Sequence, residues 1–99
     1  MIQVNGTIRV ADDASEDGIA AIITMMEKSR AETGCIDYTF ARDLTDPQVL
    51  VLFERWRDAA ALAAHGQSEH MRAFQQVMAA NPPLARDIRL YETDDGRSL

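Results

Sequence analysis

Hydrophobic and polar residues alternate along IQVNGTIRV, residues 2–10. The apolar positions on one side of the extended chain are Ile2, Val4, Ile8 and Val10. Because successive side chains point to opposite faces of a sheet, this pattern predicts a strand with one apolar face. Gly6 falls on the apolar side and leaves room there, either for packing or for a ligand.

A helical period follows the polar segment DDASEDG. Asp13 and Glu16 have the spacing of a capping box, which predicts the start of a helix. Apolar residues then recur at helical spacing and predict a stripe that is buried on one side of the helix. They are Ile19, Ile22, Ile23 and Met26, and Arg30 continues the same spacing. Gly34 is predicted to end the helix, because glycine is common just past a helix end.

Three further segments have the character of strands. Residues 35–43 place Ile36, Tyr38, Phe40 and Arg42 on one face. After a turn at Asp46-Pro47, residues 49–56 open with an unbroken apolar run, which is typical of a strand buried on both faces. One face would carry Val49, Val51, Phe53 and Arg55, and the other Leu50, Leu52, Glu54 and Trp56. Residues 87–92 predict a last strand, and residues 93–99 a loose polar tail.

The remaining segment predicts a helix in two pieces. Asp58 caps the first piece, residues 58–65, and Gly66 interrupts it. Ser68 caps the second piece, which ends before the two prolines that follow Asn81. Its inner side would carry Met71, Phe74, Gln75 and Met78.

This order of elements predicts one α+β domain over residues 1–99, with a ferredoxin-like β-α-β-β-α-β core over 2–92. Both helical segments would cover one face of an antiparallel sheet. The doubly apolar strand 49–56 needs its other face covered as well, and the same face of a second copy is the simplest cover. The sequence therefore predicts a two-fold homodimer, a dimeric α+β barrel.

Charge and composition exclude several classes of function. Lys and Arg total 10 against 16 Asp and Glu, which gives a net charge of −6 and argues against a nucleic-acid partner. The single cysteine excludes an intramolecular disulfide. The N-terminus has no basic segment followed by a long apolar run, and no stretch approaches the roughly 18 apolar residues of a membrane helix. We expect a cytoplasmic protein with no membrane partner.

The chemically capable side chains cluster in ERWRDAAALAAHGQSEH, residues 54–70. In the predicted fold, Tyr38, Phe40, Leu52 and Glu54 share the helix-facing side with Trp56 and enclose a mostly apolar ligand space. The broken helix above can bring His65 and His70 onto it.

Each of these residues also has a structural interpretation. Trp56 can be a core aromatic, and Glu54 can pair with a neighbouring arginine. His65 suits the C-terminal end of a helix dipole, and His70 can bond a backbone group. His65 and His70 lie five positions apart across a glycine, which matches no common metal-ligand spacing even with Glu54 as third ligand, so we expect no metal site.

The segment TGCIDYTFARDLTDPQVLVLFERW, followed by AALAAHGQSEHMRAF, resembles the antibiotic biosynthesis monooxygenase (ABM) family of dimeric α+β barrels. The matching positions, in family order, are Gly34, Cys35, Tyr38, Asp46, Pro47, Glu54, Trp56, Ala61, Leu62, His65, Ser68, His70 and Phe74. HGQSEHMRAF is most similar to the quinol monooxygenase type. That resemblance implies oxidation of a quinol-like or polycyclic phenol by O₂ with no metal, haem or flavin.

The resemblance also implies roles for single residues. Trp56 matches the family's pocket tryptophan, His65 and His70 match histidines of the quinol-oxidising type, and Arg72 matches an arginine of some polyketide-oxidising members. That branch has an asparagine where this chain has Leu52 and a tyrosine where it has Leu62. Haem-degrading relatives carry a tryptophan at the position of His65 and a haem ligand at that of Gln75.

Our expectation is a cofactor-independent monooxygenase. Its catalytic residues would be His65, His70 and Trp56, and its substrate contacts Tyr38, Phe40, Leu52, Glu54, Leu62 and Arg72. Two alternatives stay open at this point. One is a non-catalytic aromatic-metabolite binding or stress-response domain, and the other is an isomerase or lyase of the same barrel class.

Overall fold

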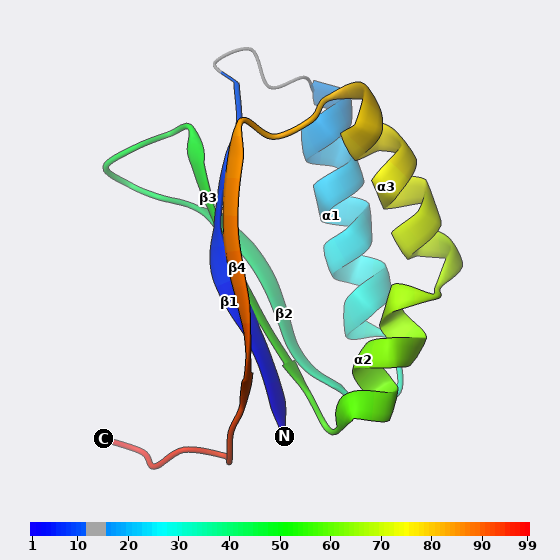
Figure 1. The fold of residues 1–99 in the computed structure, drawn as a ribbon, viewed down its shortest axis with the longest axis vertical. Coiled ribbons are helices and arrows are strands. Elements are labelled where there is room, and N and C mark those ends of the chain that lie inside the picture. Colours follow the sequence, from blue (N-terminus) through cyan, green and yellow to red (C-terminus); the bar gives the residue numbers. More distant parts are fainter. Residues whose placement is uncertain (12–15) are drawn as a thin grey trace.

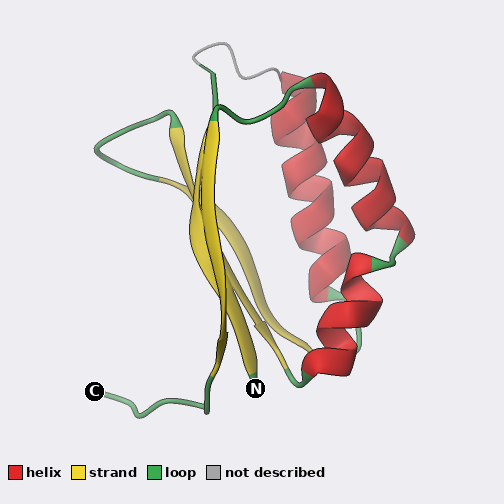
Figure 2. Cartoon of the chain, in the orientation of Figure 1, coloured by secondary structure: helices red, strands yellow, loops and turns green. Residues whose placement is uncertain are grey.

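The computed structural model describes residues 1–11 and 16–99. The elements follow in the order β1 (Ile2–Arg9), α1 (Glu16–Arg30), β2 (Cys35–Arg42), β3 (Val49–Trp56), α2 (Ala59–Gly66), α3 (Glu69–Ala80) and β4 (Ala85–Glu92). The predicted capping box lies outside the described residues, because it depends on Asp13. A sheet forms one layer, and the three helices form the other (Figures 1 and 2).

The four strands pair in the order β2-β3-β1-β4, and every pairing is antiparallel. This is the strand order of the predicted ferredoxin-like plan, which the structure confirms. The central strands are β3 and β1, whose register places Trp56 opposite Ile2 and Leu52 opposite Gly6. The predicted division of β3 into two faces is therefore correct, with Trp56 and Leu52 toward the helices.

Gly6 is required by close packing within the sheet. It pairs with Leu52 on one side and Ile88 on the other. A Cβ atom on Gly6 would overlap the backbone carbonyl oxygen of Asp87. The space left by this glycine is therefore filled by strand β4, and the packing alternative of the sequence analysis is the correct one.

The buried face of α1 differs in part from the prediction. Ile22 is buried as expected, but Ile23 is 50% exposed, and Met25 takes its place as a fully buried residue of the core. Met25 packs in one cluster with Ile2, Leu52 and Trp56, so this helix is anchored above the middle of the sheet. α3 lies beside α1 and extends the helical layer (Figure 1).

Strands β2 and β4 each depart from their predicted pattern. In β2 the register shifts between Cys35 and Asp37, so Cys35 instead of Ile36 lies opposite Trp56. This bulge leaves Ile36 43% exposed, and the prediction that it shares a face with Tyr38 is wrong. Strand β4 begins at Ala85, two positions before the predicted start.

The broken second helix has the two predicted caps. The Asp58 side chain accepts a hydrogen bond from the backbone N–H of Ala61 at 2.8 Å and begins α2. The Ser68 hydroxyl oxygen accepts one from the N–H of Met71 at 3.2 Å and begins α3. The break between the two helices covers only Gln67 and Ser68.

The sheet face opposite the helices carries exposed apolar side chains. Val51 and Phe53 of β3 are 39% and 37% exposed, and Tyr91 of β4 is 43% exposed. Their partners in the register, such as Thr7 opposite Val51, lie on the same face. Within residues 1–11 and 16–99, none of the helices has both the length and the apolar character needed to cross a bilayer.

Candidate active site

A cavity of about 570 Å³ lies between the sheet and the helices α2 and α3. Most of the side chains around it are apolar, and a few polar groups converge on it, as is usual for a small-molecule site. The sheet contributes Val4, Ile8, Tyr38, Phe40, Leu52, Glu54, Arg86 and Ile88. The helical layer and the residues after it contribute Leu62, His65, Gly66, Met71, Phe74, Gln75, Met78, Ala79 and Pro83.

A second apolar cavity of about 220 Å³ shares walls with the first. Ile8, Phe40 and Phe74 line both cavities. The smaller one extends toward Ile19 and Ile22 of α1. Together they offer room for more than one ring of a flat, apolar ligand.

The cavity gathers most of the residues predicted for the site. Those that line it are Tyr38, Phe40, Leu52, Glu54, Leu62 and His65. Trp56, His70 and Arg72 are absent from the lining described for this cavity. Arg72 is exposed on α3, and its predicted contact with substrate stays a prediction.

Trp56 lies behind the cavity wall. Its side chain is fully buried, and its indole Nε1–H donates a hydrogen bond of 2.8 Å to Glu54 Oε1. The indole also packs against the imidazole of His65, with ring centroids 4.6 Å apart. The bulky indole fills the space beneath Glu54 and His65, so the structure gives Trp56 a supporting position, and its predicted catalytic role stays a prediction.

Glu54 is a buried carboxyl group in the cavity wall. Its side chain is shielded from water, and this burial raises the pKa of Glu54 above its ordinary value of 4.5. The negative charge of Glu32 raises this pKa further, whereas the Trp56 hydrogen bond and the charge of His65 lower it. The folded protein therefore holds a proton on Glu54 to higher pH than the unfolded chain does.

This shift gives a testable effect on stability. Because the folded pKa of Glu54 is raised, its contribution to stability is fully present below the unfolded value of 4.5 and is lost as the pH rises through the folded pKa. A Glu54→Gln variant lacks this loss. Urea unfolding at a series of pH values should show the variant gaining stability relative to the wild-type protein as pH rises. A constant difference at all pH values would contradict the prediction.

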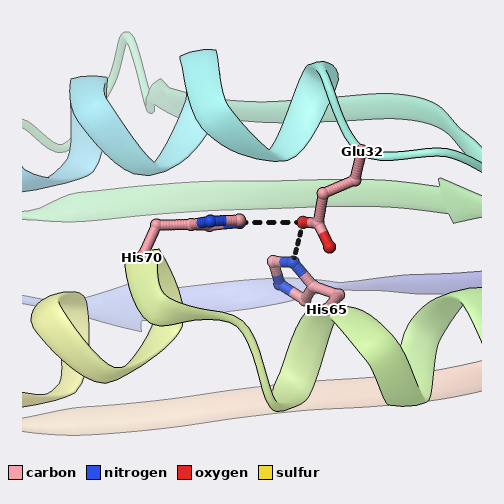
Figure 3. A group of neighbouring side chains, drawn as sticks. All are labelled: Glu32, His65 and His70. Atoms are coloured by element: carbon pink, nitrogen blue, oxygen red, sulfur yellow. Dashed lines mark hydrogen bonds and ion pairs between the residues drawn. The ribbon is translucent and has the colours of Figure 1, made fainter.

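Glu32, His65 and His70 form a hydrogen-bonded group beside the cavity (Figure 3). Glu32 lies in the turn between α1 and β2, His65 near the end of α2, and His70 in the first turn of α3. The same oxygen, Glu32 Oε2, lies 2.6 Å from His65 Nδ1 and 2.9 Å from His70 Nε2. The turn after α1 is thereby joined to the facing ends of α2 and α3, which lie more than 30 residues further along the chain.

His65 is the most enclosed member of this group, with a side chain that is 3% exposed. Its second nitrogen, Nε2, is buried and has no hydrogen-bond partner in the part of the chain that the structure describes. Buried polar atoms are seldom left unpaired, so such an atom in a cavity-lining ring requires an explanation. A hydroxyl group of a bound ligand would satisfy it.

Tyr38 stands next to this imidazole, with ring centroids 5.4 Å apart. Burial, together with the negative charge of Glu54, raises the pKa of Tyr38 above its ordinary range. The phenol therefore stays protonated near neutral pH, and Tyr38 forms part of the cavity wall. Burial and the charges of Glu32 and Glu54 likewise raise the pKa of Cys35 to about 11, so this thiol stays protonated near neutral pH.

The same three residues are the candidate metal ligands among residues 1–11 and 16–99. One donor atom each from Glu32, His65 and His70 lie within 4.8 Å of one another. However, the two nitrogens lie 2.6 Å and 2.9 Å from a single carboxylate oxygen, which are hydrogen-bond distances. A metal ion would have to replace these two contacts and separate the three donor atoms.

Glu32 was missed by the sequence analysis, which considered only Glu54 as a third metal ligand beside the two histidines. Glu32 belongs to no strand or helix, so no periodic pattern places it on a face. Its position two residues before Gly34 is the available signal. Gly34 has φ +88°, a left-handed conformation that favours glycine and turns the chain into β2.

Comparison with known proteins identifies the family. The family model for antibiotic biosynthesis monooxygenases matches residues 1–77. The chain belongs to the antibiotic biosynthesis monooxygenase family. This conclusion confirms the resemblance stated from the sequence, and the matched region includes every predicted site residue.

Individual relatives of this ABM chain agree with the assignment. An uncharacterized protein of Synechocystis is 35% identical over 98 residues, covering 99% of this chain and 67% of that protein. A Bacillus subtilis protein named "Putative monooxygenase YcnE" is 27% identical over 74 residues, covering 75% and 78% of the two chains. A crystal structure from Deinococcus radiodurans shares the fold, with a TM-score of 0.89 at 18% identity, covering 100% of this chain and 98% of that one.

Proposed function

We propose that this ABM-family protein oxidises a quinol-like or polycyclic phenol with O₂ as the direct oxidant. His65 would remove the phenolic proton through Nε2, and Tyr38 and Phe40 would enclose the rings. The observation that carries the proposal is the buried, unpaired imidazole nitrogen of a histidine that lines an apolar cavity. A histidine is suited to proton transfer near neutral pH.

The proposed reaction needs no further reductant. The phenol loses its hydroxyl proton to His65, and the electron-rich phenolate passes an electron to O₂. A carbon–oxygen bond then forms at a ring carbon that carries hydrogen. The outer peroxide oxygen takes the phenolic proton back from His65, and loss of the ring carbon's proton with cleavage of the O–O bond then gives the quinone and one water. The substrate supplies all the electrons, and the oxygen atoms of O₂ end in quinone and water.

The electrostatics of the site agree with this chemistry. When His65 accepts a proton it becomes a cation held 2.6 Å from the carboxylate of Glu32, which stabilises the protonated ring. The cavity walls of Phe40, Leu52 and Leu62 exclude water and leave flat apolar surface for aromatic rings.

The proposal is tested by O₂ uptake with a panel of hydroquinones, naphthols and anthrones and with no added cofactor. We expect uptake that depends on the protein and yields one quinone for each O₂ consumed. Ligand binding without O₂ consumption would favour a non-catalytic binding domain. A change of the ligand under anaerobic conditions would favour an isomerase or lyase, and either result would contradict the proposal.

We also propose that the exposed sheet face forms a homodimer interface. It presents Val51, Phe53 and Tyr91 in one apolar area, and the same face of a second copy offers the same chemistry.

A Phe53→Arg variant would bury an unpaired charge in this interface, which should weaken association by more than about tenfold. Sedimentation at a series of concentrations measures this. A variant that associates like the wild-type protein would contradict it, and Leu84→Arg, at a 64% exposed position outside the strands, is the control.

A further inference from the structure

The two histidines bonded to Glu32 differ in their surroundings. We infer that Glu32 is the positioning residue of the site: it holds neutral His65 in the tautomer with hydrogen on Nδ1, which leaves Nε2 as the proton acceptor. The catalytic meaning of this assignment rests on the proposed function, but the tautomer itself does not.

The hydrogen-bond geometry carries the first step. An ionised carboxylate only accepts hydrogen bonds, so any ring nitrogen bonded to it must carry a hydrogen. Glu32 Oε2 receives both His65 Nδ1, at 2.6 Å, and His70 Nε2, at 2.9 Å (Figure 3). Both nitrogens therefore act as donors, and a neutral His65 has its lone pair on Nε2.

Backbone hydrogen bonds fix the turn that carries Glu32. The N–H of Glu32 donates to the carbonyl oxygen of Ser29 at 3.0 Å, and its own carbonyl oxygen accepts from the N–H of Cys35 at 3.2 Å. The carbonyl oxygen of Gly34 accepts from the N–H of Arg57 at 2.8 Å, which ties this turn to the end of β3. The Glu32 carboxylate is then bonded to two imidazole rings from different helices, and these two contacts fix its orientation.

The two imidazole rings differ in how far their side chains are exposed to solvent, and this difference indicates different roles. The His65 side chain is 3% exposed, whereas those of His70 and Glu32 are 14% and 16% exposed. His70 is absent from the described lining of the cavity, and its contact is with the carboxylate. We therefore assign His70 as a second donor that supports Glu32, and not as a group that touches substrate. A histidine–carboxylate pair that fixes the tautomer of a base is a recurring device in catalysis.

The test is nitrogen-15 NMR of the imidazole rings, recorded while the pH is raised until His65 is neutral. We expect Nδ1 of His65 to give the signal of a protonated nitrogen and Nε2 that of an unprotonated one. In Glu32→Leu, which offers no acceptor, we expect a mixture containing the opposite tautomer. Glu27→Gln, at an exposed position of α1, is the matched control and should preserve the wild-type spectrum.

The wild-type measurement needs no variant to fold and no substrate to be known. Hydrogen on Nε2 of neutral His65 in the wild-type protein would overturn the inference. So would a Nδ1 signal that moves when a metal chelator is added, because the three residues would then hold a metal ion. His70→Gln should preserve the His65 tautomer. Loss of that tautomer in the His70→Gln variant would overturn the assignment of different roles to His65 and His70. A protein without O₂ uptake but with the expected tautomer would contradict the proposed function alone.

Discussion

Replacing His65 by glutamine should reduce kcat for phenol oxidation by about 10²- to 10⁴-fold, which is the contribution typical of general acid–base catalysis. Glutamine has nearly the size of histidine and keeps polar atoms at its end, but it cannot take up a proton. Because the ring's partner is Glu32 and the cavity walls are otherwise unchanged, KM should change much less than kcat. Steady-state O₂ uptake with the best substrate of the phenol panel measures both constants.

Two variants complete this experiment. Gln76→Ala changes an exposed side chain on the same helical layer and should retain wild-type kcat. His70→Gln removes one donor to Glu32 and should lower kcat less than His65→Gln does, because His65 keeps its own bond to the carboxylate. Equal kcat in the His65→Gln variant and the wild-type protein would remove His65 from the mechanism.

The largest loss of stability is expected from Trp56→Ala, at about 3–5 kcal/mol of unfolding free energy. The indole is fully buried, packs on His65 and Tyr38, and supplies a hydrogen bond to the buried Glu54. Alanine would leave a cavity beneath the site and an unpaired carboxyl group within it. Urea unfolding followed by circular dichroism measures the change, since the variant has no tryptophan fluorescence.

Trp56→Phe divides this effect into its parts. Phenylalanine keeps an aromatic ring in the core but loses the N–H donor, so about 1–3 kcal/mol should be lost through the unpaired Glu54 oxygen. Leu84→Ala removes a large apolar side chain that is 64% exposed and should change stability by less than about 0.5 kcal/mol. If Trp56→Ala were as stable as Leu84→Ala, the supporting role of Trp56 would be wrong.

The elements of the fold were predictable wherever side-chain periodicity is unambiguous. The two faces of residues 49–56 follow directly from the period of two in a strand. The register of α1 was only partly predictable, because apolar residues occur around much of that helix and both Ile23 and Met25 are apolar. The bulge at Ile36 and the early start of β4 depend on backbone pairing with neighbouring strands, which leaves no pattern in the local sequence.

The sequence was enough to predict which strand residues line the cavity, but not which side chains contact one another within the site. Tyr38, Phe40, Leu52 and Glu54 line the cavity because strand parity fixes which way they point. Trp56 shares that parity, yet its size and its hydrogen bond to Glu54 keep it in the core. Glu32 could not be placed, since its position depends on how a turn in one part of the chain meets two helix ends from another part.

The short break between α2 and α3 decides which chemistry the helical layer can offer. In an unbroken α-helix, positions five residues apart point about 140° away from each other around the axis. Here the interruption at Gln67 and Ser68 redirects the chain so that His65 and His70 reach one carboxylate oxygen. The length of this two-residue joint thus determines how the two imidazole rings are placed relative to each other. A chain of the same architecture with one residue more or fewer at the joint would keep its sheet and its apolar chamber, but its two rings would no longer share an acceptor.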